Sequence, residues 1–196
     1  MNLNDFRNLF VVSSLVLILL VISPTLNLFF PLSVEESFSA LSIIGPNRLA
    51  KDYPFNVIPN REERLFVTVD NNMGESSYYR IYVKFRNQTQ SSPKDNEPSL
   101  LTPLYEYRVF LVDGGTFEGE LNFNFLETIY SNDTVLVKKL MINNQIFELD
   151  SFCIWDYEYG GFYFQLFFEL WLYDVNLHRF NYYDRGFVGL WLNMTV

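Results

Sequence analysis

The segment CIWDYEYGG, residues 153–161, places two carboxylates among three aromatic rings. If the segment is extended, Asp156 and Glu158 point to the same side, because side chains alternate along a strand. Two such carboxylates could bind Ca²⁺ through their oxygens or act as the acid pair of a glycosidase. Carboxylates two residues apart are also ordinary in a polar loop, which is the interpretation we favour. We therefore predict no metal and no cofactor, and Asp156 and Glu158 are the one calcium candidate.

Aromatic side chains gather in the last third of the chain. They are Trp155, Tyr157, Tyr159, Trp171, Tyr173, Tyr182, Tyr183 and Trp191. Such rings fill cores and pair across strands, but on an outward face they stack on sugars or anchor a protein interface. Trp171 and Trp191 fall on strand faces opposite the fully apolar ones, which favours the outward role. The predicted interface or glycan-binding residues are Trp155, Glu169, Trp171, Tyr173 and Trp191.

No catalytic signature is present in the sequence. It has no glycine-rich phosphate loop, no G-x-S-x-G motif and no H-E-x-x-H motif. The single histidine, His178, is expected in an exposed turn, and one His with one Cys is too little for a zinc site. The single cysteine, Cys153, forms no internal disulfide and is expected to be a small buried side chain. We predict that the protein is not an enzyme.

Three N-x-[ST] sequons are possible glycosylation sites: Asn87, Asn132 and Asn193. Asn87 and Asn132 fall in predicted loops. Asn193 falls on the outward face of the last predicted strand, where the strand itself can block it.

The elements that must position these residues are strands. In residues 78–86, four apolar side chains alternate with charged ones, which is the pattern of a strand with one buried face. The same pattern occurs at residues 64–70, 116–125 and 187–196. Less regular strand candidates are residues 38–44, 53–58, 105–112, 135–142 and 145–149. Asn143 and Asn144 separate two of these runs and predict a tight hairpin turn.

The apolar segment GFYFQLFFELWLYD, residues 161–174, could be a membrane span, a buried helix or a strand. It is too short to cross a bilayer and carries Glu169. Its many Phe, Tyr and Trp residues favour a strand. One of its faces is wholly apolar and the other is mixed, so we predict a central strand whose mixed face meets solvent, a loop or a partner.

Residues 9–30 contain no charged side chain, and Arg7 precedes them. A helix of this length crosses a hydrocarbon core, and the positive-inside rule places the N-terminus in the cytoplasm. We favour a retained anchor over a cleaved signal peptide, because the run is long and no A-x-A site follows it. The predicted organisation is a cytoplasmic tail (1–8), a transmembrane helix (9–30), a linker (31–37) and an extracytoplasmic domain (38–196). The protein is then a single-pass cell-membrane protein that contacts the bilayer through residues 9–30.

Composition limits the function classes. The net charge is −9, which argues against nucleic acid and against adhesion to an anionic membrane surface. Short alternating segments separated by turns indicate a mainly β fold, an antiparallel immunoglobulin-like β-sandwich. Residues 87–99, NQTQSSPKDNEPS, are expected to form an exposed, mobile loop.

The segments GFYFQLFFELWLYD (161–174) and RGFVGLWLNMT (185–195) resemble the end of an archaeal membrane-protein family known only as a domain of unknown function, DUF1616. Residues 52–72 and 104–117 also resemble the sandwich domain of that family. The resemblance implies an archaeal envelope protein with an external β domain, and it implies no catalytic residues. Family members often have several N-terminal spans, whereas this chain has one.

Three functions follow as hypotheses. The favoured one is an accessory subunit of a membrane or surface complex, which docks on a membrane or envelope protein through the face around Trp171 and Trp191. The alternative is a carbohydrate-binding module for surface glycans. A hydrolase that uses Asp156 and Glu158 is the least favoured.

Overall fold

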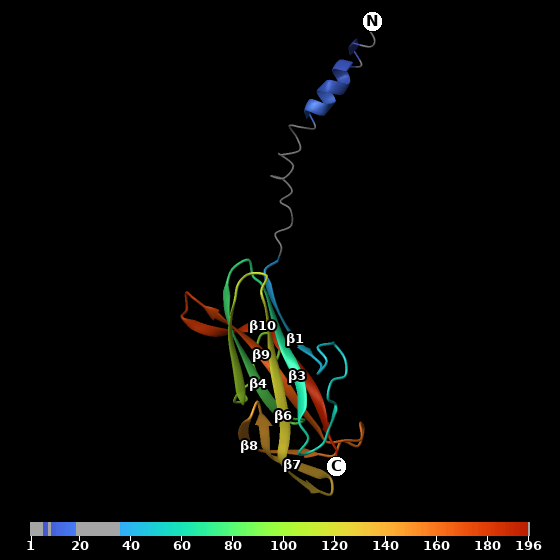
Figure 1. The fold of residues 1–196 in the computed structure, drawn as a ribbon, viewed down its shortest axis with the longest axis vertical. Helices are drawn as coiled ribbons and strands as arrows, with labels where there is room; N and C mark the ends of the chain where they lie inside the picture. Colours follow the sequence, from blue (N-terminus) through green and yellow to red (C-terminus); the bar gives the residue numbers. More distant parts are fainter. Residues whose placement is uncertain (1–5, 8, 19–35, 196) are drawn as a thin grey trace. The chain divides into compact units, whose positions relative to one another are not determined.

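The computed structural model describes residues 6–7, 9–18 and 36–195 (Figure 1). The chain divides into two compact units, Met1–Glu36 and Ser37–Val196. In the first unit, residues 6–7 and 9–18 are helical and mostly exposed. Within the described part of the chain, no helix has the length and apolar character needed to cross a membrane. Most of the predicted span, and the linker up to residue 35, lie outside the described residues, so the anchor stays a prediction.

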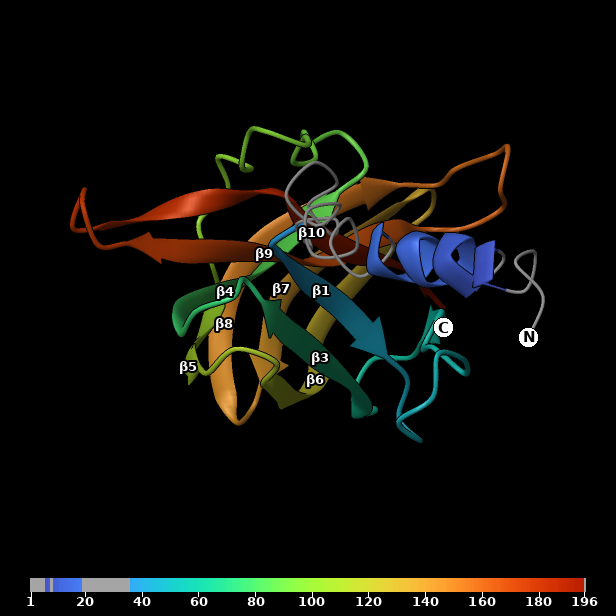
Figure 2. The same ribbon diagram turned by 90° about the horizontal axis from the view of Figure 1, so that it is seen from above.

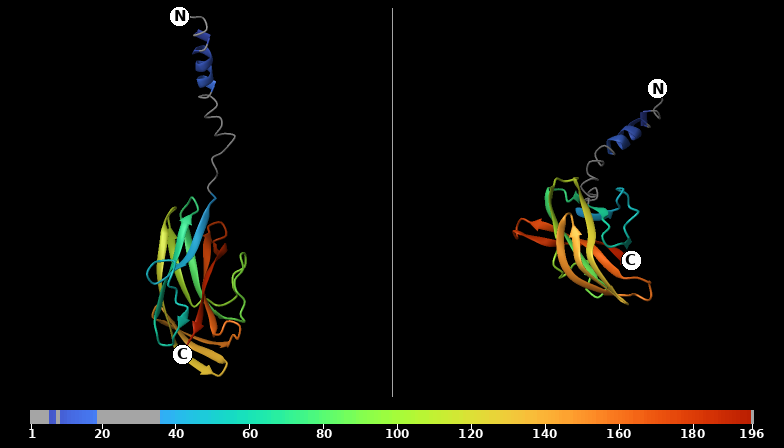
Figure 3. Two further views of the ribbon diagram at one scale, coloured as in Figure 1. Left: turned by 90° about the vertical axis from the view of Figure 1, so that its right-hand side faces the viewer. Right: turned by 60° about the horizontal axis from the view of Figure 1, so that its bottom comes forward.

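The second unit is built from ten strands in two five-stranded sheets that pack face to face (Figures 1 and 3). The first sheet contains, in hydrogen-bonded order, β1 (Phe38–Ile44), β3 (Glu63–Asn72), β6 (Thr116–Ser131), β7 (Thr134–Ile142) and β8 (Gln145–Ile154). The second contains β2 (Asn56–Val57), β10 (Arg179–Met194), β9 (Tyr163–Asp174), β4 (Ser77–Asn87) and β5 (Tyr105–Leu111). The predicted mainly β sandwich is therefore confirmed.

The topology resembles that of a variable-type immunoglobulin sandwich. The order β10-β9-β4-β5 corresponds to strands G, F, C and C′, and β3 pairs with β6 as strand B pairs with strand E. The short β2 pairs in parallel with the end of β10, whereas the other pairs are antiparallel. The difference is that β7 and β8 follow β6 as a meander, where an immunoglobulin domain has strand D.

Alternation along the strands creates the core between the sheets, as the sequence predicts. In β3, Leu65, Val67 and Val69 are fully buried, and Tyr79, Ile81 and Val83 of β4 face them from the other sheet. β6 contributes Leu121, Phe123 and Phe125. Burying one such side chain stabilises the fold by roughly 1.5–3 kcal/mol. The apolar face therefore determines which side of each strand points into the core.

The segment that could have been a membrane span is β9, the strand hydrogen-bonded between β10 and β4. Its apolar face, with Phe164, Leu166, Phe168 and Leu170, lies in the core. The β9–β10 hairpin then projects beyond the rest of the sheet (Figure 2), and its turn exposes Val175 and Leu177. His178 lies exposed in the same turn, as predicted, and has a positive φ.

Several predicted boundaries are wrong. The candidate strand at 53–58 is reduced to the two residues of β2, and β8 runs five residues further than predicted, to Ile154. β10 begins at Arg179 rather than 187. A bulge between Tyr182 and Phe187 divides it into two parts, and both parts pair with β9. Residues 156–160 form a turn, closed by a bridge between Asp156 and Gly161, so the segment is not extended.

The segment between β4 and β5, residues 88–104, is here called the strap. Its backbone lies against the outer face of the second sheet, the face turned away from the core. Ser99 N donates to Glu169 Oε1 (2.7 Å), and Tyr182 Oη donates to Lys94 O (3.1 Å). The prediction of an exposed loop holds for Thr89, residues 91–92 and residues 94–97 but not for Pro93 and Ser99, which are buried, because polar groups on β4 and β9 hold part of the strap by hydrogen bonds.

Candidate functional site

The middle of the outer face is closed by a buried ion pair. Lys84 Nζ lies 2.8 Å from Glu169 Oε2, and the two side chains are 4% and 0% exposed. Lys84 Nζ also donates to Ser99 O (2.7 Å), so the pair is capped by the strap. Glu169, predicted as an interface residue, is therefore not at an open surface.

Trp171 and Tyr173, two further predicted interface residues, lie at one end of this face and are half-buried. The Trp171 ring packs edge-on against Tyr82 and Tyr182, with centroids 5.6 and 5.8 Å away. Tyr173 packs against Phe180, with centroids 5.1 Å apart. These rings mostly contact one another across β4, β9 and β10, which is the stabilising role of cross-strand pairs.

Trp191 lies at the opposite end of the outer face, on β10. The Arg86 guanidinium lies over its ring, 4.8 Å from the centroid. Arg86 Nε donates to Gln165 Oε1 (2.6 Å), and Arg86 also donates to Gln90 O. Burial lowers the pKa of Arg86. The Trp191 ring therefore packs against the Arg86 guanidinium, which the strap and β9 hold in place by hydrogen bonds.

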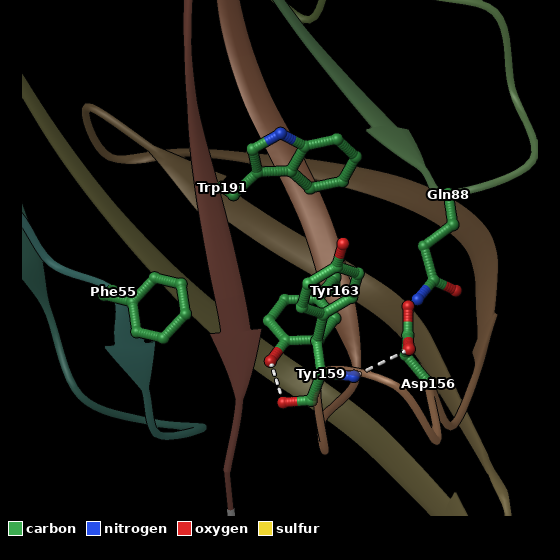
Figure 4. Close-up of a pocket in the computed structure, with 6 residues that line it drawn as sticks. All are labelled: Phe55, Gln88, Asp156, Tyr159, Tyr163 and Trp191. Atoms are coloured by element: carbon green, nitrogen blue, oxygen red, sulfur yellow. Dashed lines mark hydrogen bonds between the residues drawn. The ribbon is translucent and has the colours of Figure 1, made fainter.

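A cleft of about 430 Å³ opens beside Trp191 (Figure 4). Its lining residues come from five places in the chain: Phe55 before β2, Gln88 after β4, Asp156 and Tyr159 in the turn after β8, Tyr163 at the start of β9, and Trp191. The Phe55 and Tyr163 rings are 6.1 Å apart, and the Tyr159 and Tyr163 rings are 6.5 Å apart. Four rings thus surround one carboxylate and one amide.

Asp156 both organises this turn and faces the cleft. Its Oδ1 accepts hydrogen bonds from Glu158 N (2.9 Å) and Tyr159 N (3.0 Å), and Gly160 closes the turn with φ +67°. Tyr163 Oη donates to Tyr159 O (2.8 Å), which fixes the turn against β9. Glu158 is exposed and does not line the cleft. Across the described residues, no group of three His, Cys, Asp or Glu side chains is placed to hold a metal.

Gln88 is oriented by the buried cysteine. Cys153 Sγ lies 3.0 Å from Gln88 Oε1 and donates to it. Burial raises the pKa of Cys153 to about 11, so the thiol keeps its proton at neutral pH. The Gln88 oxygen is therefore occupied, and Figure 4 shows its nitrogen turned toward Asp156.

The sequence identified only part of this cleft. Trp191 is among the predicted interface or glycan-binding residues, and Asp156 and Tyr159 stand in the segment 153–161, whereas nothing in the sequence singles out Phe55 and Gln88. Phe55 is 47% exposed beside a short strand, and that unusual exposure is visible only in the fold. Trp155 is not part of the lining: it packs edge-on against Phe162, 5.0 Å between centroids, at the border of the core.

The three sequons differ in access. Asn87 is 5% exposed, and its Nδ2 donates to Phe152 O (2.8 Å). Asn193 is half-buried, with its Nδ2 donating to Asn56 Oδ1 (3.0 Å). Asn132 is exposed in the β6–β7 turn.

Solved structures similar to this chain share little sequence with it. The CARDB domain of the PF1109 protein from Pyrococcus furiosus, in complex with di-metal ions, is 10% identical, with a TM-score of 0.42; the match covers 84% of this chain and 93% of that one. A β-glucosidase from Listeria innocua in complex with glucose is 7% identical, with a TM-score of 0.38; the match covers 82% of this chain and 16% of the enzyme. Nothing about function follows from similarities at this level. The curated proteins contain no match.

A family model does match. It is described as domain of unknown function (DUF1616) and covers residues 32–135, more than half of the chain. The matched range runs from before β1 into β7 and includes residues 52–72 and 104–117, two of the segments that resemble this family. It ends before the C-terminal segments at 161–174 and 185–195. This chain therefore belongs to the DUF1616 family.

Proposed function

We propose that this protein is a membrane-anchored component of the archaeal cell envelope whose external β-sandwich binds a saccharide in the cleft beside Trp191. The observation that carries the proposal is the cleft itself: four aromatic rings around Asp156 and Gln88. Ligand sites are typically concave, mostly apolar and provided with a few fixed polar groups, and about 430 Å³ is within their usual size. A sugar ring supplies both an apolar face for the indole and hydroxyl groups for the two polar side chains.

The geometry favours binding without catalysis. A glycosidase needs two carboxyl groups on opposite sides of the scissile bond. Glu158 is exposed in the turn and outside the cleft, so Asp156 has no carboxyl partner among the lining residues. The hydrolase hypothesis therefore receives no support from the arrangement.

The anchor part of the proposal rests on the uncharged run at residues 9–30 and on Arg7 before it. We expect the full chain to stay with membranes in high salt and in alkaline carbonate, and to be released by detergent. Release by carbonate alone would contradict a spanning helix.

Binding is tested with the full chain purified in detergent. We expect measurable retention on immobilised polysaccharides or a glycan array, and loss of that retention in Trp191→Ala. Trp171→Ala is the matched control, because it removes an indole from the same sheet face at the other end, outside the cleft. Absence of binding across a broad panel, or equal loss in both variants, would contradict the proposal.

A second function, that of an accessory subunit, is favoured by a different surface. Ile129 of β6, Leu136 of β7 and Phe152 of β8 pair side by side, and Ile129 and Phe152 are 45% and 53% exposed. Phe152→Glu should then remove a stoichiometric partner that co-purifies with the full chain from native membranes. If the partner still co-purifies with the Phe152→Glu variant, the surface formed by Ile129, Leu136 and Phe152 is not the docking site.

A further inference from the structure

We propose that the saccharide bound in the cleft carries a free, protonated amino group, as in an amino sugar, and that Asp156 receives this group. The inference rests on the proposed function and adds the chemical class of the ligand to it. The observation behind it is the unpaired carboxylate of Asp156, not the shape of the cleft.

Among residues 36–195, the carboxylate of Asp156 has no cationic partner. None of the ion pairs found in residues 36–195 includes it. Its Oδ1 is occupied by two backbone N–H groups of its own turn, while Oδ2 takes part in none of the hydrogen bonds of the described side chains. One carboxylate oxygen is therefore left for a ligand.

Arg86, which lies against the cleft residue Trp191, does not pair with this carboxylate. Its guanidinium lies over Trp191 and donates to Gln165 and to the strap at Gln90. Glu158, two residues after Asp156, adds a second negative charge to the same turn. The net charge of −9 makes the whole chain attractive to cations.

A ligand that covers Asp156 removes water from a charged group, which is costly unless the ligand supplies a matching charge or good hydrogen bonds. An ammonium group supplies both. The same position is close to aromatic rings, whose faces attract cations. Neutral hydroxyl groups would satisfy the carboxylate only in part, so the cleft distinguishes an amino sugar from its neutral analogues.

The experiment compares three tetrasaccharides that differ only in the substituent at C2: cellotetraose with a hydroxyl, chitotetraose with an acetamido group, and fully deacetylated chitotetraose with an ammonium group. Binding to the full chain in a neutral detergent is measured by calorimetry at low salt and about pH 6, where carboxylates and sugar amines are ordinarily charged. We expect the deacetylated ligand to bind roughly tenfold more tightly than the other two, and this preference to decrease in high salt.

Asp156→Asn keeps an oxygen that accepts from Glu158 N and Tyr159 N, so the turn is preserved while the charge is removed. We expect this variant to lose the preference for the amino sugar, because its neutral amide does not attract an ammonium group. Glu158→Gln, which removes a neighbouring exposed charge outside the cleft, should keep the preference.

The outcomes separate the two proposals. Equal affinity for the three ligands, abolished by Trp191→Ala, would overturn the inference and leave the saccharide site standing. A preference for the amino sugar that survives Asp156→Asn would also overturn the inference. No binding of any of the three ligands would overturn it together with the saccharide site for this class of glycan.

Discussion

Glu169 and Lys84 are charged side chains in a place where the sequence pattern alone would put a solvent-facing pair. Water is nearly excluded from both, and Ser99 supplies hydrogen bonds to each from the strap. A buried pair of this kind contributes little net stability compared with apolar residues, but removal of one partner leaves an uncompensated buried charge. A substitution at Glu169 therefore disturbs folding as well as any contact with a partner, so it cannot test the two separately.

Glu169→Ala is expected to lower the free energy of unfolding by about 3–5 kcal/mol, because it leaves the buried Lys84 without its ion-pair partner. The measurement is urea unfolding of the full chain in detergent, followed by tryptophan fluorescence. Glu97→Ala is the control, since it breaks the exposed pair with Lys94 and should change stability by less than about 1 kcal/mol. Equal effects of the two substitutions would contradict the burial of the pair. The combination Lys84→Met with Glu169→Gln should recover most of the loss.

Cys153 is expected to be unreactive in the folded protein. Burial raises its pKa to about 11, above the ordinary value near 8.5, so little thiolate forms at neutral pH. Ellman's reagent at about pH 8 should label the chain only after denaturation. Because the unfolded chain ionises this thiol first, its contribution to stability is complete below about pH 8.5 and decreases as the pH rises toward about 11. Rapid labelling without denaturant would contradict this.

At the scale of elements, the core strands could be predicted because alternation and burial have the same physical cause. Leu65 and Val67, or Phe164 and Leu166, define a face whatever the rest of the chain does. The cleft could not be predicted, because its residues are joined by pairings distant in sequence: Phe55 meets Tyr163 only after β2 has paired with β10. The strap was missed for a related reason, since its polar residues hydrogen-bond to groups on β9.

The β7–β8 hairpin provides a local prediction. Asn143 and Asn144 both have positive φ, 45° and 65°, as a two-residue turn of this type requires. Asn144→Gly should leave the melting temperature unchanged or slightly raised, whereas Asn144→Val should cost about 1–2 kcal/mol, because a β-branched residue is strained there. Gln145→Val, in the adjacent extended residue, is the control and should have little effect. A Val substitution tolerated equally at both positions would contradict the turn.

At the scale of the whole molecule, the family match and the cleft overlap only in part. Phe55 and Gln88 lie inside residues 32–135, whereas Asp156, Tyr159, Tyr163 and Trp191 lie beyond them. The cleft joins the two regions.

Access to the sequons gives a prediction for the mature domain. We expect added glycan mass at Asn132 alone, because the side-chain amides of Asn87 and Asn193 donate hydrogen bonds within the fold. Intact-mass spectrometry of the chain from native membranes measures this, and Asn132→Gln should remove the added mass. Glycan on Asn87 would contradict the burial of that side chain.

The position of β4 between β5 and β9 has a consequence for how the chain reaches this fold. β5 follows β4 closely in the chain, but Tyr79 pairs with Leu172 and Asn87 with Phe164 of β9, so the second partner of β4 is made only after most of the domain has been synthesised. Closing so long a loop is entropically costly and makes folding slow. During synthesis from the N-terminus, the edge of β4 that pairs with β9 therefore stays unpaired until β9 emerges. The sandwich therefore cannot close before its C-terminal third arrives, which suits the export across a membrane that the proposed function requires.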